Sequence, residues 1–260
     1  MNENILLSIN NLRVYFKSNE DIIKAVDGTS FNIKSGEIVA IVGESGSGKS
    51  ISALSITKIA PKSALYIGGS IKFKNLDLFH LNEKELNNIR GNKIAYIFQE
   101  PMTSFNPVFT IGDQIKEAVR LHNKKINFSK KVDSLLDKVH LPKRLKNSYP
   151  HQMSGGQLQR CMIAMALACS PDLLIADEPT TALDVTIQKE ILILLKELKE
   201  TENLSILLIT HNFGVVSEIS DRVYVMNSGK IVETGLTLDI LNNPQKKYTI
   251  DLIDAVPRLI

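Results

Sequence analysis

The eight residues from Gly43 to Ser50, with the sequence GESGSGKS, combine glycine, lysine and serine in the spacing of a phosphate-binding loop. The pattern has two glycines separated by four residues and then Lys-Ser, and such loops cradle nucleotide phosphates on backbone amides. The lysine reaches the β- and γ-phosphates, and the serine hydroxyl holds Mg²⁺. We therefore predict that ATP or GTP binds here, and the expected binding residues are Gly43, Glu44, Ser45, Gly46, Ser47, Gly48, Lys49 and Ser50.

Two carboxylates follow an apolar run later in the chain. Leu173 to Ala176 read as a buried strand, and Asp177 and Glu178 come directly after it. In a parallel sheet the carboxyl ends of the strands share one edge, so both acids are expected on the side of the phosphate loop. Asp177 is the natural partner of Mg²⁺ through water, and Glu178 can accept a proton from the water that attacks the γ-phosphate. The alternative is a solvated strand end.

A Ser-Gly-Gly-Gln turn opens a predicted helix. Ser154 is a favourable N-cap, and Gly155 and Gly156 leave the first helical amides uncovered. The positive end of the helix favours an anion, so the turn from Ser154 to Gln157 is a second candidate anion site. An ordinary capped helix is the alternative.

Two single polar residues also follow predicted strands. Gln99 comes after Lys93 to Phe98, and His211 comes after Ile206 to Thr210. On the residues alone, a histidine after a strand is more often an ordinary residue at a strand boundary, and Gln99 is similarly ambiguous.

A phosphate loop, then a Ser-Gly-Gly-Gln turn, then Asp-Glu after an apolar strand resembles the ATP-binding-cassette (ABC) ATPases. The resemblance implies that two such subunits sandwich two ATP molecules. The turn from Ser154 to Gln157 then closes over the γ-phosphate held by the partner's phosphate loop, and the loop Ala182-Leu183-Asp184 crosses the same interface.

The resemblance also implies roles for the remaining candidates. His211 contacts the γ-phosphate and orients Glu178 and the water. Gln99 touches Mg²⁺ or the attacking water and connects the core to a helical subdomain. The magnesium ligands are then Ser50, Gln99 and Asp177. Phe16 stacks on adenine, with Tyr15 as the alternative. Without the resemblance, either residue would be interpreted as an ordinary aromatic side chain on a surface strand.

The elements that position these residues alternate between strands and helices. Strands are predicted at 38–42, 69–73, 93–98, 173–177, 205–210 and 222–226, and helices at 49–59, 111–122, 129–139 and 155–168. Residues 7–35 read as short alternating strands with turns at Ser18-Asn19 and at 34–36, and residues 227–230 as a hairpin turn into 231–233. The predicted fold is α/β. It has a RecA-like phosphate-loop core with a parallel sheet, an N-terminal antiparallel β subdomain, an inserted helical subdomain at about 101–166 and a short helical extension at about 236–260.

Composition excludes several other classes. The 31 basic and 28 acidic residues are scattered, which gives no case for nucleic-acid binding. The N-terminus lacks the pattern of a secretory signal, and no run approaches about 18 apolar residues, so we expect a soluble cytoplasmic polypeptide. Cys161 and Cys169 lie in an apolar setting and are expected to be buried thiols.

Three further stretches resemble the peptide and nickel importer subgroup, as the first of two ATPase subunits: EPMTSFNP at 100–107, ADEPTTALDVTIQ at 176–188 and YTIDLIDAVPR at 248–258. This implies uptake of oligopeptides or dipeptides, with nickel or a metal chelate as the alternative. The implied partners are two transmembrane permeases, a related but non-identical second ATPase and an extracytoplasmic substrate-binding protein, and the implied location is the cytoplasmic face of the cell membrane. Many relatives continue into a cysteine-containing tail, whose function we expect to be absent because the sequence stops at Ile260.

Two other classes of protein fit less well. A soluble cassette ATPase of translation or DNA repair usually has two cassettes or a long insertion, and neither is visible. A phosphate-loop kinase would lack the Ser-Gly-Gly-Gln turn and the strand that ends in His211.

Overall fold

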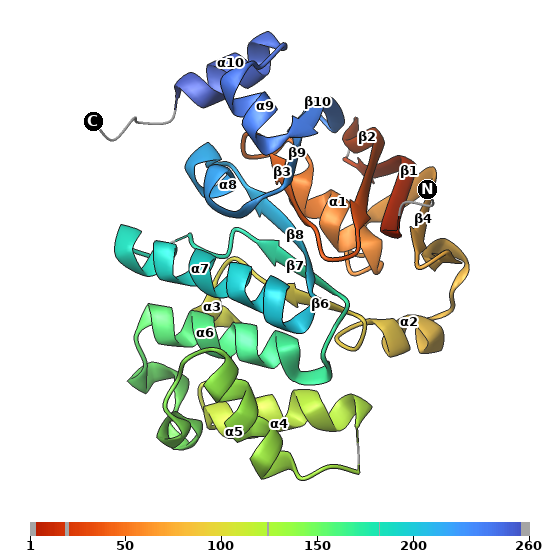
Figure 1. The fold of residues 1–260 in the computed structure, drawn as a ribbon. Coiled ribbons are helices and arrows are strands. Elements are labelled where there is room, and N and C mark those ends of the chain that lie inside the picture. The colour runs from red at the N-terminus through yellow and green to blue at the C-terminus, as the bar shows by residue number, and fades with distance from the viewer. Residues whose placement is uncertain (1–3, 19–20, 124, 182, 256–260) are drawn as a thin grey trace. The chain divides into compact units, whose positions relative to one another are not determined.

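The computed structural model describes residues 4–18, 21–123, 125–181 and 183–255. It contains two compact units, one formed by Met1–Leu86 with Ser205–Ile260 and the other by Asn87–Leu204 (Figure 1). Three predictions fall partly outside the described residues: Asn19 of the first predicted turn, Ala182 of the predicted interface loop, and residues 256–260 of the C-terminal extension.

The first unit has a mainly parallel layer of strands, in the order β10-β9-β3-β8. Their bounds are β3 (Ile38–Val42), β8 (Ser205–Thr210), β9 (Arg222–Asn227) and β10 (Lys230–Leu236). β3 pairs in parallel with both β8 and β9, and every residue of β3 and β8 is buried. Such continuous apolar runs are typical of parallel strands covered on both faces, so the predicted parallel core is confirmed.

The predicted hairpin between β9 and β10 is also confirmed. Lys230 pairs with Asn227 in an antiparallel ladder, which leaves Ser228 and Gly229 as the loop. Their φ angles are 47° and 77°, and a two-residue hairpin loop of this type requires positive φ at both positions.

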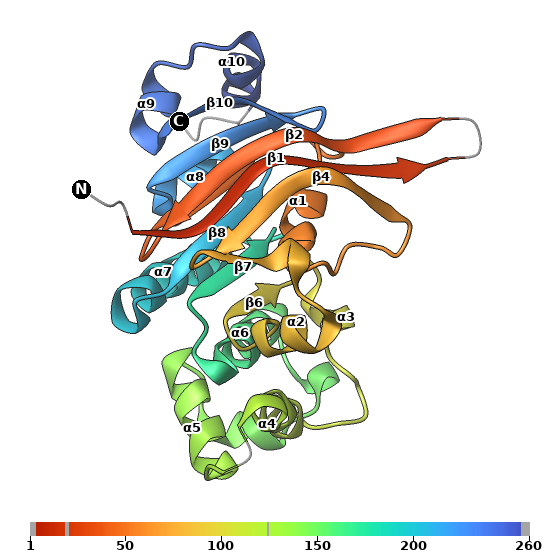
Figure 2. The same cartoon turned by 90° about the vertical axis from the view of Figure 1, so that its right-hand side faces the viewer.

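An antiparallel sheet in the order β2-β1-β4-β5 completes the strands of the first unit (Figure 2). Its strands are β1 (Ile5–Lys17), β2 (Ile22–Lys34), β4 (Ala64–Phe73) and β5 (Leu76–Asp77). The sequence predicted short strands here, but β1 and β2 each run for 13 residues. The register shifts between Ile9 and Leu12, and Asn11 has a φ of 48°. This bulge breaks the alternation of side chains without ending the strand, which explains the difference.

Short helices surround these strands: α1 (Lys49–Ile56), α8 (Phe213–Ile219), α9 (Thr237–Asn242), α10 (Lys247–Asp254) and the 3₁₀ turn η1 (Leu78–His80). The helix α2 (Glu83–Ile89) spans the boundary of the two units in sequence. α1 ends three residues earlier than the predicted Ile59, and α9 and α10 lie in the range predicted as the C-terminal extension.

The second unit combines two parallel strands with most of the helices. The strands are β6 (Ile94–Ile97) and β7 (Leu173–Asp177). The helices are α3 (Pro101–Ser104), α4 (Ile111–His122), α5 (Phe128–Lys138), α6 (Gly155–Ala166) and α7 (Val185–Glu202), with 3₁₀ turns η2 (Lys143–Asn147), η3 (Pro150–Gln152) and η4 (Leu167–Cys169). The bounds of α4 are those predicted, and α6 changes to the 3₁₀ turn η4 after Ala166. The inserted subdomain at 101–166 lies within this unit and stays a prediction.

The two cysteines differ from expectation in one respect. Cys161 is fully buried, and burial raises the pKa of its thiol to about 12. Cys169, the last residue of the turn η4, is only half-buried, so the prediction was wrong for this residue. Across the described ranges, every helix is either too short or too polar to pass through a bilayer.

Candidate nucleotide-binding site

The phosphate loop connects β3, which ends at Val42, to α1, which begins at Lys49. The side chain of Lys49 is buried, and its Nζ donates hydrogen bonds of 2.8 Å to the carbonyl oxygens of Gly43 and Glu44. The loop therefore folds around its own lysine. Lys49 is thus held at the centre of the loop, where a cation attracts phosphate.

Two glycines of the loop are required for different physical reasons. Gly48 has a φ of 104°, which favours glycine, and a Cβ there would lie 2.2 Å from the carbonyl oxygen of Ala25. Gly43 has no such φ, but its Cβ would lie 2.1 Å from the carbonyl oxygen of Met226. The backbone of the loop is packed directly against β9 at that point, and any larger residue would displace it.

The first turn of α1 presents backbone amides to the loop. Its N-cap is Gly48, which has no side chain to cap these amides, and the turn contains no acidic residue. Uncapped amides and the positive end of the helix dipole favour an anion. Ser50, the second residue of α1, is half-buried. The loop and helix together have the features of a phosphate-binding site.

The hairpin turn between β9 and β10 supports the loop from outside. The amide of Gly229 donates a hydrogen bond of 2.9 Å to the carbonyl oxygen of Ser47. The carbonyl oxygen of Gly229 accepts from the Asp27 amide at 2.8 Å and from Thr29 Oγ1 at 2.7 Å. The sequence showed the turn but not this contact, since a contact across the fold has no signature in local spacing.

In the second unit, Gln99 and Glu178 lie together. Gln99 Nε2 donates to Glu178 Oε2 at 3.1 Å, and Thr181 Oγ1 donates to the same oxygen at 2.9 Å. Glu178 also has a φ of 48°, a conformation that costs a residue with a side chain about 1–2 kcal/mol. Such backbone conformations cluster at functional sites. Thr181 was missed by sequence reasoning, although the Thr-Thr pair after Pro179 is visible in the sequence.

The Ser-Gly-Gly-Gln turn is a reciprocal cap. The Gln157 amide donates to Ser154 Oγ at 3.3 Å, and the Ser154 amide donates to Gln157 Oε1 at 3.1 Å. The predicted N-cap is therefore confirmed. Gly155 is exposed, whereas a Cβ on Gly156 would lie 2.7 Å from Cγ2 of Ile187 in α7. Gly156 thus permits close packing of α6 against α7.

Asp184 is the N-cap of α7. Its Oδ1 accepts a hydrogen bond of 3.0 Å from the amide of Ile187, the residue whose side chain covers Gly156. Asp177, at the end of β7 before Glu178, is half-buried.

The remaining candidates lie in the first unit. Phe16 in β1 is half-buried and pairs with Ile23 and Ala64. The Tyr15 hydroxyl donates to Asp27 Oδ1 at 2.6 Å, a hydrogen bond that raises the pKa of Tyr15 and lowers that of Asp27. His211 follows β8 and is exposed. The roles of these side chains stay predictions.

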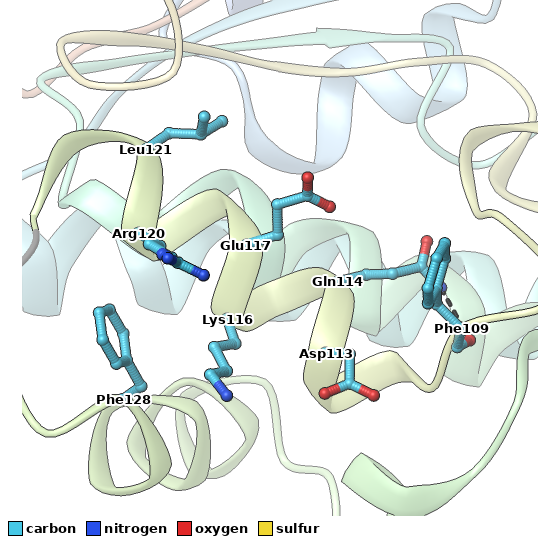
Figure 3. A pocket seen from close by; sticks show the side chains of 8 residues that line it. All are labelled: Phe109, Asp113, Gln114, Lys116, Glu117, Arg120, Leu121 and Phe128. Atoms are coloured by element: carbon cyan, nitrogen blue, oxygen red, sulfur yellow. Dashed lines mark hydrogen bonds between the residues drawn. The ribbon is translucent and has the colours of Figure 1, made fainter.

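Among the hollows that the described residues of the second unit form on its surface, two adjoin each other. The smaller, of about 280 Å³, is largely apolar and is lined by Tyr96, Phe98, Leu121 and Met165 among others. The larger, of about 1140 Å³, extends along α4 (Figure 3). It is lined by Phe109, Asp113, Gln114, Lys116, Glu117, Arg120, Leu121 and Phe128. Leu121 lines both hollows and is 71% exposed, so they adjoin at this side chain.

Comparison with known proteins agrees with this geometry. The family described as "ABC transporter" matches residues 26–181. The chain is 51% identical over 260 residues to the dipeptide transport ATP-binding protein DppD of Bacillus subtilis, covering 98% of this chain and 77% of the relative. It is 47% identical to the oligopeptide transport ATP-binding protein OppD of Salmonella typhimurium, with 98% and 77% coverage.

A solved structure has the same fold. A dimeric ATP-binding cassette in a post-hydrolysis state with ADP and Pi superposes with a TM-score of 0.80 at 30% identity, over 89% of this chain and 98% of that one. The phosphate loop around Lys49 and the Gln99–Glu178 pair lie in a chain that matches this family over most of its length. The chain belongs to the ABC transporter family and is an ATPase of that family.

Proposed function

We propose that this chain is the ATP-hydrolysing subunit of an importer that takes up oligopeptides or dipeptides across the cytoplasmic membrane. The relatives that it matches over nearly its whole length are named as dipeptide and oligopeptide transport ATP-binding proteins. The single observation that carries the ATPase chemistry is the carboxylate of Glu178, oriented by hydrogen bonds from Gln99 and Thr181. A base must be held in one orientation to accept a proton efficiently.

In this proposal Lys49 and the amides of the phosphate loop bind the ATP phosphates, and Glu178 accepts the proton of the attacking water. His211 orients that water, and Phe16 stacks on adenine. Ser50, Gln99 and Asp177 supply the oxygen donors that Mg²⁺ prefers. When bound, Mg²⁺ supplies charge neutralisation at the phosphates.

The proposal assigns the apolar hollow beside Phe98 to a permease. Phe98 is 46% exposed in this hollow, and its ring stacks on Tyr96 with centroids 5.9 Å apart. The next residue is Gln99, whose amide holds Glu178. A cytoplasmic segment of a permease that fills the hollow would contact the residue adjacent to the one that orients the base. Movement at the hollow and the state of the nucleotide are then linked through two consecutive residues.

The complete assembly in this proposal has two transmembrane permeases, a second and related ATPase chain, and an extracytoplasmic substrate-binding protein. The chain lies at the cytoplasmic face of the membrane. The ATP held by the second ATPase is then contacted by Ser154, Gly155, Gly156, Gln157 and Asp184. Support for this arrangement comes from the two N-caps that present Ser154 and Asp184, both of which are exposed.

The test combines uptake with turnover. A strain lacking this gene is complemented with the natural chain or with Glu178→Gln, and uptake of labelled di- and oligopeptides and of nickel is measured. We expect the natural chain to restore peptide uptake and Glu178→Gln to restore none. The purified variant should bind ATP normally but hydrolyse it at least about 100-fold more slowly. Restoration of nickel uptake alone would overturn the peptide assignment, and normal hydrolysis by Glu178→Gln would remove Glu178 as the base.

A further inference from the structure

The phosphate loop is contacted by a residue from the last described helix of the chain. The Glu44 amide donates a hydrogen bond of 3.1 Å to the hydroxyl oxygen of Tyr248, 204 residues later in the sequence. Tyr248 is the second residue of α10, which lies in the same unit as the loop. None of the motifs that define the nucleotide site includes this residue.

The contact holds a peptide group that also holds the lysine. The Glu44 N–H, which donates to Tyr248, and the carbonyl of Gly43 belong to the same peptide unit, and that carbonyl oxygen accepts a hydrogen bond of 2.8 Å from Lys49 Nζ. A peptide unit is planar, so a hydrogen bond that fixes the direction of the Glu44 N–H also fixes the direction of the Gly43 carbonyl that accepts from Lys49. Glu44 and Ser45 are exposed, and such exposed segments have many conformations unless contacts restrict them.

Tyr248 is itself held in place. The carboxylate of Glu233 in β10 accepts hydrogen bonds from the amides of Gln245 and Lys246, at 2.6 and 3.2 Å, directly before α10. Thr249, the residue after Tyr248, is fully buried and anchors the helix. Burial raises the pKa of the Tyr248 phenol, so the group is neutral at physiological pH. A carboxylate on β10 and a buried helix residue thus hold the start of α10, which carries Tyr248.

We propose that Tyr248 is a positioning residue for ATP binding, because its hydroxyl holds the peptide unit between Gly43 and Glu44 in the orientation that places Lys49 for the phosphates. This role of Tyr248 rests on the ATP-binding part of the proposed function. It adds a residue that affects ATP affinity from outside the nucleotide-binding motifs. Its physical basis is preorganisation: a loop already ordered loses less conformational entropy when the nucleotide binds.

The first test measures ATP affinity of the purified full chain by equilibrium binding of ATP. Tyr248→Phe removes only the hydroxyl, and we expect Kd to rise about threefold to tenfold, the effect of one lost hydrogen bond. The matched control is Tyr66→Phe in β4, which removes a hydroxyl from a 36% exposed ring packed on Phe79 and is expected to leave Kd unchanged. An unchanged Kd for Tyr248→Phe would overturn the inference. Failure of the natural chain to bind ATP would instead overturn the proposed function.

Two further readouts separate positioning from a general loss of stability. In the assembled transporter, Tyr248→Phe should raise KM for ATP in proportion to Kd and leave kcat at saturating ATP within about twofold. Less folded protein would lower kcat without moving KM, and that result would count against positioning. Without nucleotide, hydrogen exchange at the Glu44 amide should become faster in Tyr248→Phe, while the Gly229 amide, bonded to Ser47, stays protected. Equal exchange at Glu44 in both proteins would exclude the contact.

Discussion

Gln99 Nε2 and Glu178 Oε2 are 3.1 Å apart, although the two residues are separated by 79 positions in the sequence. The side chain at the end of β6 thus orients the carboxylate at the end of its parallel partner β7. Thr181 donates to the same oxygen from the following turn. The carboxylate is held by two donors on different segments, and their contributions can be separated by substitution.

Gln99→Ala removes one of these donors and leaves the other. We expect kcat for ATP hydrolysis to fall about tenfold with little change in ATP affinity, because the base is then less well oriented. Thr181→Val, which keeps the shape of the side chain, should have an effect of similar size. In the double variant, kcat should fall by less than the product of the two single-variant factors, because both side chains donate to the same oxygen. Steady-state kinetics of the three variants checks this, and full activity of both single variants would refute the role of the two donors.

Gly43→Ala adds a single methyl group to the phosphate loop. Because its Cβ would lie 2.1 Å from the carbonyl oxygen of Met226, either the loop or β9 must shift. We expect ATP affinity to fall at least about tenfold and the free energy of unfolding to fall by about 1–3 kcal/mol. Gly68→Ala in β4 is the matched control, since its Cβ would meet no atom within 4 Å. Equal ATP binding by both alanine variants would contradict the close packing at Gly43.

Ser154→Arg tests the shared site that is proposed between two ATPase chains. Loss of the N-cap of α6 should lower the free energy of unfolding by about 1 kcal/mol, and the bulky cation should block ATP-dependent association. Asn127→Arg is the control, because Asn127 caps α5 by accepting the Lys130 amide and its loss costs a similar amount. Association is measured by the ATP-dependent change in size of the assembled ATPase pair. Normal association of Ser154→Arg would show that the turn lies outside the interface.

The Glu233 carboxylate predicts a specific dependence on pH. Burial alone would raise the pKa of Glu233, but the side chain of Thr249 and the hydrogen bonds from the amides of Gln245 and Lys246 lower it below the usual range. A group with a lowered pKa stabilises the fold above its unfolded pKa of about 4.3, and this contribution disappears as the pH falls through the lower, folded value. The difference in unfolding free energy between the natural chain and Glu233→Gln should therefore be constant above about pH 5.5 and shrink below about pH 4. A difference that grows on acidification would contradict this sign.

The parts of the fold that were predictable have local causes. α4 follows from buried residues at Ile111, Ile115 and Val119 and from Thr110, which caps its start. The β9–β10 hairpin follows from a polar turn with glycine. β1 was not predictable in length, because the bulge at Asn11 shifts the side-chain alternation that signals a strand.

The parts of the site that were not predictable depend on contacts across the chain. The Gly229 amide on Ser47 and the Tyr248 hydroxyl on Glu44 join residues about 180–200 positions apart. Hydrophobic spacing records only which face of an element is buried, and it carries no information about such partners. The phosphate loop was predictable because its function needs consecutive residues, whereas its support comes from elements that fold against it.

Ile187 connects the turn at Ser154 to the cap at Asp184. Its side chain covers Gly156 so closely that a methyl group could not be inserted, and its amide is bonded to Asp184. A shift of either segment would therefore displace the other. We expect the turn at Ser154 and the cap at Asp184 to move together as one rigid unit. A partner that displaces one of these two segments would also displace the other. The surfaces at Ser154 and Asp184 should therefore bind and release a partner in a single step.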